Sequence, residues 1–214
     1  MDKRLKEIFC AIPKCSVFAD IGCDHGYMTE QMLKENKCER AVISDVSKKC
    51  LIKAENLLKD YINEGRVQAL VSDGFDNLPK VDTALIAGMG GEEISKILLK
   101  CKNLPNSLIL QPMKNPETVR KTLIDLSYRL EKDYIFKVGR RFYVLIVAVK
   151  GKDILSEEEI EFGRTNLLTK SDDFIGWVKE EISKTAKYLT RDNLSENSRK
   201  ELEKRKERLN KCIN

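Results

Sequence analysis

The chain has 214 residues, of which 42% are hydrophobic and 34% are charged, and its formal net charge at pH 7 is +5. This composition is typical of a soluble globular protein and excludes a disordered or membrane-embedded chain. No apolar run approaches the roughly 20 residues that span a bilayer, and the first residues lead into no signal peptide. We therefore expect a cytoplasmic protein without a membrane partner, whose mild positive charge permits a polyanionic partner.

Seven cysteines and one histidine occur in the chain, and no two cysteines form a C-x-x-C pair. A zinc site needs thiolates or imidazoles at such close spacings, so we expect no bound metal. In an intracellular chain the cysteines are expected to be reduced and to pack as small hydrophobic side chains.

Short apolar runs typical of buried strands alternate with segments of helical periodicity, after a basic amphipathic start around residues 4–9. The expected strands are residues 17–21, 41–44, 67–71, 84–87 and 108–110. The expected helices between them are residues 28–33, 47–62, 92–99 and 116–126. Strands that are apolar on both faces and joined by helices predict an α/β fold, with a mostly parallel sheet covered on both sides.

The pattern changes near residue 128. Two β-type runs, residues 133–136 and 142–149, flank the turn Val138-Gly139-Arg140-Arg141 with no helix between them, which predicts a hairpin. A parallel sheet that closes with an antiparallel pair is typical of the class I methyltransferase fold, whereas dinucleotide-dependent dehydrogenases usually continue in parallel.

The composition changes again after residue 150, so we expect two domains, residues 1–152 and residues 153–214. Ser156 and Glu159 have the spacing of a capping box. Two amphipathic helices follow, one up to Leu189 and one from Ser195, with a polar break at residues 191–193, which predicts an antiparallel helical pair. This pair could stabilise the fold, form a weak dimer contact, or bind RNA as a basic arm, and the sequence leaves these interpretations open. The chain is expected to be a monomer or a weak homodimer.

The run from residue 17 to residue 28 reads as a buried strand, a glycine-bearing turn and a helix, which is how open α/β sheets build a nucleotide-type pocket. A dinucleotide fingerprint has a glycine at its middle position, where the pyrophosphate lies against the backbone. Here Asp24 occupies that position between Gly22 and Gly26, and its carboxylate would repel a pyrophosphate. A ligand without phosphates, such as S-adenosylmethionine (SAM), would fit.

Acidic residues follow three successive strands. Asp20 ends the first strand and suits the ammonium end of SAM, Asp45 ends the second strand and suits the ribose hydroxyls, and Asp73 follows the third strand and suits the adenine amino group. Each aspartate could instead be a helix cap or a turn residue. The three together favour a SAM site.

At this point the chain resembles a known family, the bacterial tRNA adenine-N1 methyltransferases that modify adenine 22. The resemblance rests on Asp20-Ile-Gly22-Cys-Asp24-His25-Gly26-Tyr27, on Ile86-Ala87-Gly88-Met89-Gly90-Gly91 and on Leu110-Gln111-Pro112, and it covers residues 3 to about 149. At two positions the chain departs from the family pattern, with Cys23 where serine and Gly26 where alanine is more usual.

The resemblance implies a Rossmann-like seven-stranded class I methyltransferase domain, a C-terminal helical, coiled-coil-like domain, SAM as donor and tRNA as acceptor. The implied cofactor-binding residues are Asp20, Gly22, Cys23, Gly26, Asp45, Val46, Ser72, Asp73, Gly74, Ala87, Gly88 and Met89.

The exit of the fourth strand indicates the reaction. Methylation of an exocyclic amine typically uses an Asn/Asp-Pro-Pro-aromatic loop, whereas this chain has a glycine-rich segment. A ring nitrogen such as adenine N1 needs no deprotonation, only in-line placement and stabilisation of the positive charge that develops. Asp24 is our candidate for that stabilisation, and His25 could orient it, contact the substrate, or simply pack beside the helix start. Tyr27 could stack on a base or lie in the core.

Because adenine N1 lies on the Watson–Crick edge, the target base must be unpaired or extruded. The expected substrate-binding residues are Tyr27, Gly90, Gly91, Gln111, Pro112, Arg140 and Arg141. Further cations expected to hold phosphates are Lys3, Arg4, Lys114, Arg120 and Lys137. The alternatives are a methyltransferase for another RNA or a small molecule, a nucleotide-dependent oxidoreductase, and a non-catalytic RNA-binding protein.

Overall fold

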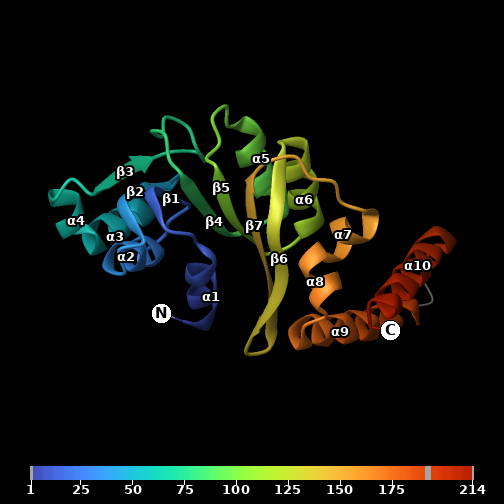
Figure 1. Ribbon diagram of the computed structural model, residues 1–214. Coiled ribbons are helices and arrows are strands. Elements are labelled where there is room, and N and C mark those ends of the chain that lie inside the picture. Colours follow the sequence, from blue (N-terminus) through green and yellow to red (C-terminus); the bar gives the residue numbers. More distant parts are fainter. Residues whose placement is uncertain (1, 191–193, 214) are drawn as a thin grey trace.

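The computed structural model describes residues 2–190 and 194–213. These residues form a seven-stranded sheet with the strand order β3-β2-β1-β4-β5-β7-β6 (Figure 1). The strands are β1 (Cys15–Ile21), β2 (Cys38–Asp45), β3 (Val67–Val71), β4 (Thr83–Met89), β5 (Ser107–Pro112), β6 (Tyr128–Val138) and β7 (Arg141–Lys150). The first five are parallel, and β7 is antiparallel to both of its neighbours. The predicted α/β fold with a terminal hairpin is confirmed.

Helices cover both faces of the sheet, as strands that are apolar on both sides require. The helix before the first strand is α1 (Lys3–Ala11). The helices between the strands are α2 (Tyr27–Lys34), α3 (Lys48–Leu57), α4 (Lys59–Asn63), α5 (Gly91–Lys100) and α6 (Pro116–Asp125). Ile8, Met32 and Ala54 from α1, α2 and α3 share one core cluster, while Leu98 and Val119 from α5 and α6 belong to the cluster on the opposite face. The sheet therefore separates two apolar layers.

The segment predicted as one helix over residues 47–62 is divided into α3 and α4 at Leu58. The backbone of Leu58 has φ −100° and ψ 14°, which lies outside helical geometry. Its side chain is fully buried in the core beside α2 and α3. The break in the helix accompanies the full burial of the Leu58 side chain. The spacing of hydrophobic residues in the sequence does not reveal it.

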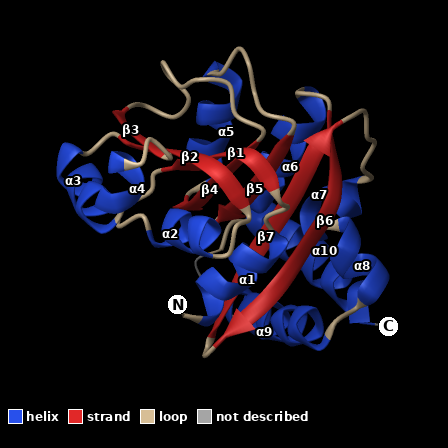
Figure 2. Cartoon of the chain, turned by 60° about the vertical axis from the view of Figure 1, so that its left-hand side comes forward, coloured by secondary structure: helices blue, strands red, loops and turns tan. Residues whose placement is uncertain are grey.

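The hairpin extends beyond the sheet at the edge where the parallel strands end. The pairing of β5 with β7 stops at Leu110 and Ile146, whereas β6 and β7 stay paired as far as Val138 and Arg141. Because β6 runs in the same direction as β5, the turn of the hairpin lies on the side of the carboxyl ends of the strands. Figure 2 shows the two long strands reaching down to α1 and α9 (Asp172–Leu189).

The C-terminal part of the chain is helical, as predicted. It consists of α7 (Glu157–Phe162), α8 (Arg164–Thr169), α9 and α10 (Glu196–Ile213). The capping box of Ser156 and Glu159 is present at the start of α7, whereas α8 carries no motif that we used for prediction. Phe174, Val178 and Leu209 form a separate core with Ile135 of β6. The polar break expected at residues 191–193 lies outside the described residues.

Two arginines of the expected basic arm hold α10 in place. Arg205 lies 3.2 Å from a carboxylate oxygen of Glu181 on α9, and Arg208 lies 2.6 Å from one of Glu161 on α7. Both arginines are therefore neutralised within the helical region. This observation favours a stabilising role for these two residues over phosphate binding.

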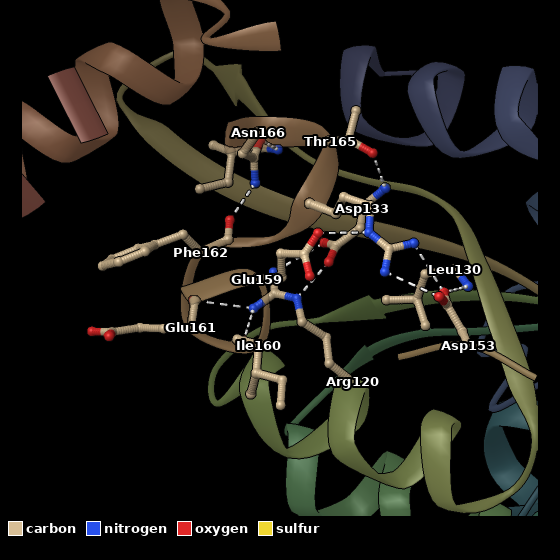
Figure 3. A network of polar contacts seen from close by, with 12 residues as sticks. Arg120, Leu130, Asp133, Asp153, Glu159, Ile160, Glu161, Phe162, Thr165 and Asn166 are labelled. Atoms are coloured by element: carbon tan, nitrogen blue, oxygen red, sulfur yellow. Dashed lines mark hydrogen bonds and ion pairs between the residues drawn. The ribbon is translucent and has the colours of Figure 1, made fainter. Parts of the chain in front are cut away.

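A buried ion pair between α6 and β6 lies where the helical region meets the sheet (Figure 3). The guanidinium of Arg120 on α6 donates to both carboxylate oxygens of Asp133 on β6, at 2.5 and 2.9 Å, and both side chains are 1% exposed. A further nitrogen of Arg120 donates to the carbonyls of Ile160 and Glu161 in α7. The prediction that Arg120 holds phosphates is therefore wrong, because its donors are taken up by internal acceptors.

None of the helices in residues 2–190 and 194–213 combines the length and the apolar character that a membrane crossing needs. Within the same residues, no three histidine, cysteine, aspartate or glutamate side chains come together as a metal site would require.

Candidate functional site

A cavity of about 400 Å³ opens at the carboxyl ends of β1, β2, β3 and β4, within the range of small-molecule sites. The strand exits meet here because parallel strands end at the same edge of a sheet, and ligands of open α/β sheets bind at this edge. Arg4 and Leu5 of α1 close one side, and Glu93 and Ile97 of α5 close another.

The turn after β1 is held by backbone hydrogen bonds. The amides of Gly22 and Cys23 both donate to the carbonyl of Ser44, at 2.8 and 3.0 Å, which ties the turn to the end of β2. Gly22 has φ 72°, and a Cβ at this position would collide with the end of the Met89 side chain. Asp24 has φ 47°, a conformation that aspartate tolerates better than most residues and that concentrates at functional sites. The positive φ of Gly22 and the nearby Met89 side chain therefore favour glycine at position 22, next to the cavity.

Asp20 is a buried carboxylic acid at the floor of the cavity. It is 5% exposed and accepts a hydrogen bond of 3.0 Å from the hydroxyl of Thr29. Burial raises the pKa of Asp20 to about 6, and the negative charge of Asp45 adds to the rise. At neutral pH the group is ionised at a cost in folding stability, so its site is prepared for a cation.

This cost predicts how stability depends on pH. Because the pKa of Asp20 is raised on folding, its charge costs nothing below about pH 4 and destabilises the fold by about 3 kcal/mol above pH 6. We expect Asp20→Asn to raise the free energy of unfolding of the ligand-free protein by up to about this amount at pH 8, and by little at pH 4. Urea denaturation at both pH values measures it. An equal effect at the two pH values would contradict the assignment.

Two further carboxylates line the cavity with different surroundings. Asp45 accepts from the backbone amide of Ser47 at 2.8 Å and from that of Asp24 at 3.4 Å, so the turn orients its side chain. Asp73 is 64% exposed and pairs with Lys100 at 3.0 Å. The position of Asp45 is thus held rigidly, whereas Asp73 is shared with a surface lysine.

The rim of the cavity carries the groups expected to face a substrate. An oxygen of Asp24, whose side chain is 65% exposed, lies 3.7 Å from Nε2 of His25. The rings of His25 and Tyr27 are stacked, with centroids 5.4 Å apart and an interplanar angle of 8°. Tyr27 is 52% exposed, which places it on the surface rather than in the core. The three side chains form a polar and aromatic rim.

Most of the expected cofactor residues line this one cavity. Those that do so are Asp20, Gly22, Cys23, Asp45, Val46, Ser72, Asp73, Gly74, Ala87, Gly88 and Met89. Gly26 lies outside it, at the start of α2, where a Cβ would be 3.0 Å from the Cβ of Ala54 on α3. Gly26 permits α2 and α3 to approach closely. The sequence motif alone does not distinguish this packing role from contact with a ligand.

The expected substrate residues are spread more widely. Gln111 is fully buried and accepts a hydrogen bond of 3.0 Å from Arg4. Gly91 begins α5, where the backbone of Asn115 leaves no room for a Cβ, and Gly90 is the residue before it. Pro112 lines a second cavity, and Arg140 and Arg141 lie at the exposed turn of the hairpin.

Arg4 lines the cavity, although the sequence predicted only that it would hold phosphates. Its side chain lies beside Gly88 and contacts the ring of Tyr143 as well as Gln111. The positive charge in an amphipathic first helix is visible in the sequence, but its placement over the strand exits depends on how α1 packs. Glu93 and Ile97 on α5 were not predicted either, because their place at the cavity depends on how α5 packs.

The carboxylates around the cavity fit SAM better than a dinucleotide. Three carboxylates, those of Asp20, Asp45 and Asp73, surround the cavity, and Asp24 adds a fourth at the rim. Such a site disfavours a pyrophosphate and favours a ligand that carries an ammonium, a sulfonium and a ribose diol. A Cβ at Gly88 would meet only Arg4, at 4.0 Å, so the backbone of the fourth strand exit is open to a bound molecule.

Comparison with known proteins agrees with this geometry. A family model described as a methyltransferase domain matches residues 1–146. A Mycoplasma pneumoniae protein named as a tRNA methyltransferase is 32% identical over 157 residues, which are 70% of this chain and 72% of that protein. The tRNA (adenine(22)-N(1))-methyltransferase of Bacillus subtilis is 28% identical over 71% of this chain and 66% of its own length. The structure of M. capricolum TrmK with S-adenosyl-homocysteine superposes with a TM-score of 0.91 and 24% identity, covering 100% of this chain and 97% of that one.

Proposed function

This chain belongs to the tRNA methyltransferase family, and from this premise we propose that it transfers the methyl group of SAM to N1 of adenine 22 in tRNA. The observation that carries the proposal is the cavity at the strand exits, where the carboxylates of Asp20, Asp45 and Asp73 disfavour a pyrophosphate and suit the ammonium and the ribose of SAM. The match to the Bacillus subtilis enzyme supports adenine 22 as the target.

The residues of the cavity have distinct roles in holding the donor. SAM supplies an electrophilic methyl group on a positively charged sulfur. Asp20 would attract the ammonium of the amino acid part. Asp45, already oriented by two backbone amides, would accept from the ribose hydroxyls. Asp73 would contact the adenine amino group, and the backbone at Gly88 and Met89, which also lines the cavity, would lie against the ligand.

Asp24 is the proposed catalytic residue. Adenine N1 carries an in-plane lone pair, so the reaction requires placement of the base and stabilisation of the positive charge that it gains. The carboxylate of Asp24 is at the rim of the cavity and is not one of the three carboxylates proposed to hold SAM. His25 lies beside it. The stacked rings of His25 and Tyr27 offer a flat surface for the extruded base.

We further propose that residues 1–152 form the methyltransferase domain and residues 153–214 a helical domain that contributes to tRNA binding. The apolar core of α7, α9 and α10, which is distinct from the two clusters on the faces of the sheet and shares only Ile135 of β6 among its buried residues with the first domain, supports this division. The hairpin turn, which carries the exposed Arg140 and Arg141, lies near α9 (Figure 2) and on the side of the sheet where the cavity opens, so both would be close to a tRNA bound there.

The proposed function is tested by incubating the protein with labelled SAM and unmodified tRNA and identifying the modified nucleoside by mass spectrometry. We expect 1-methyladenosine, and its loss when adenine 22 of the tRNA is replaced by guanine. Label at N6 of adenine, or no label in tRNA, would contradict the proposal.

Replacement of Asp24 tests the catalytic assignment. We expect Asp24→Asn, which keeps the size and the backbone tolerance of aspartate, to lower kcat about 10–100-fold, because the charge opposite the developing cation is lost. The Kd for SAM should stay close to that of the unchanged protein, since Asp24 does not hold the donor. Steady-state kinetics together with calorimetric titration separate the two quantities. An unchanged kcat would exclude Asp24 from catalysis.

A further inference from the structure

A second cavity, of about 340 Å³, lies beside the projecting part of the hairpin. Its walls come from the segment after β5, from β6 and β7, and from α9. Because β5 stops at the register of Ile146, the edge of β7 from Phe142 to Leu145 has no β5 partner beside it. The cavity therefore combines apolar walls with backbone groups of an open strand edge, which can donate and accept hydrogen bonds.

Three aromatic residues line the second cavity: Phe142, Tyr143 and Trp177. The ring of Trp177 is stacked on that of Phe174, with centroids 6.0 Å apart and an interplanar angle of 20°. Phe142 packs against Gly176 of α9 and carries the ammonium of Lys137 above its ring, 4.8 Å from the centroid. The rings are held in place and partly exposed, which is the arrangement that proteins use to stack nucleobases.

The surroundings of the second cavity are positively charged. Lys114 lines it, and Lys3, Lys137, Arg140 and Arg141 are exposed on α1 and at the hairpin turn. Within the described residues, these five cations take part in no ion pair. The carboxylate in the wall, that of Glu181, is neutralised by Lys184 and Arg205. The charge thus suits a phosphate backbone.

The two cavities are neighbours. Arg4 lines the first cavity, donates to the buried side chain of Gln111 and lies 5.9 Å from the ring centroid of Tyr143, which lines the second. Pro112, the residue after Gln111, also lines the second cavity. Arg4 and Gln111 therefore lie between the SAM cavity and the second cavity, which we call the aromatic cavity.

We propose that the aromatic cavity binds a second unpaired nucleobase of the tRNA, one close along the chain to the target adenine. Extrusion of the target leaves its neighbours without a stacking partner, and a base held between Phe142 and Trp177 recovers part of that lost energy. The cavity on the other side of Trp177 is less suited, because Glu117, Glu157 and Glu161 line it. This inference rests on the proposed function.

The first test uses the unchanged protein, because Trp177 is its single tryptophan. We expect saturating tRNA to protect Trp177 from quenching by acrylamide, with a drop in the quenching constant of about threefold or more, as a stacked base covers the ring. Unchanged quenching at saturating tRNA would overturn the proposal. Methyl transfer to tRNA is measured on the same preparation, so a failure of the proposed function is seen separately.

The second test compares variants. Trp177→Ala is expected to raise the KM for tRNA about tenfold, with the KM for SAM unchanged, and Trp177→Phe to recover most of the affinity. Lys114→Ala should also raise the KM for tRNA, whereas Lys121→Ala, an exposed lysine on the other side of Trp177, should not. A normal KM for tRNA in folded Trp177→Ala would refute the inference. If that variant does not fold, the quenching measurement decides.

Discussion

Replacing Asp133 by alanine is expected to lower the free energy of unfolding by about 3–5 kcal/mol, because the guanidinium of Arg120 is then left buried without its charge partner. The two side chains are 1% exposed and joined by two hydrogen bonds, so water cannot replace the lost carboxylate. Urea denaturation followed by circular dichroism measures the change.

A matched control is available on the same strand. Glu131 pairs with Arg129 at 3.0 Å, and both side chains are about half exposed, so Glu131→Ala should change the free energy of unfolding by less than about 1 kcal/mol. Removal of both buried charges, as Arg120→Met with Asp133→Leu, should recover most of the stability, since a well-packed apolar pair can replace a buried ion pair. A small effect of Asp133→Ala would show that the region relaxes to admit water.

Replacing Asp45 by alanine is expected to weaken SAM binding about 100-fold or more. The carboxylate of Asp45 is oriented by the amides of Ser47 and Asp24, so it meets the two ribose hydroxyls without further ordering. Two hydrogen bonds to a charged group are worth about 3 kcal/mol or more together. Isothermal titration calorimetry with SAM and with S-adenosyl-homocysteine gives the affinities.

The control for this prediction is Asp76→Ala. Asp76 also pairs with Lys100, at 2.5 Å against 3.0 Å for Asp73, but it does not line the donor cavity. We expect its replacement to leave SAM affinity within about twofold, because a surface ion pair contributes little. An Asp45→Ala variant that is folded by circular dichroism and binds SAM as tightly as the unchanged protein would remove Asp45 from the site.

The acidic strand exits could be predicted from the sequence because they depend on local patterns. A buried strand that ends in a turn places its last residues at the carboxyl edge, and parallel strands bring these edges together. Asp20, Asp45 and Asp73 were found in this way, and all three line the cavity. The hairpin was visible for a similar reason, since two β-type runs meet at a turn without a helix.

Residues whose environment depends on packing between distant segments were not predictable. Arg120 reads as an exposed helix cation, and its burial follows from the approach of β6 and α7, which lie at other places in the chain. Gln111 reads as a loop residue, yet it is sealed from solvent and bound by Arg4, 107 residues away. Gly26 resembles a ligand-contacting glycine, although its neighbour is a helix.

The contact of Arg120 with Asp133 and with the end of α7 restricts how this protein can be recombined. Exchanging residues 153–214 with those of a relative would replace the helix that positions the backbone carbonyls of residues 160 and 161, which accept two of the hydrogen bonds of Arg120. A graft that lacks equivalent acceptors leaves part of a buried guanidinium unsatisfied. Chimeric enzymes should therefore be joined so that α6, β6 and α7 come from the same parent, and substitutions at positions 120 and 133 should occur together during divergence.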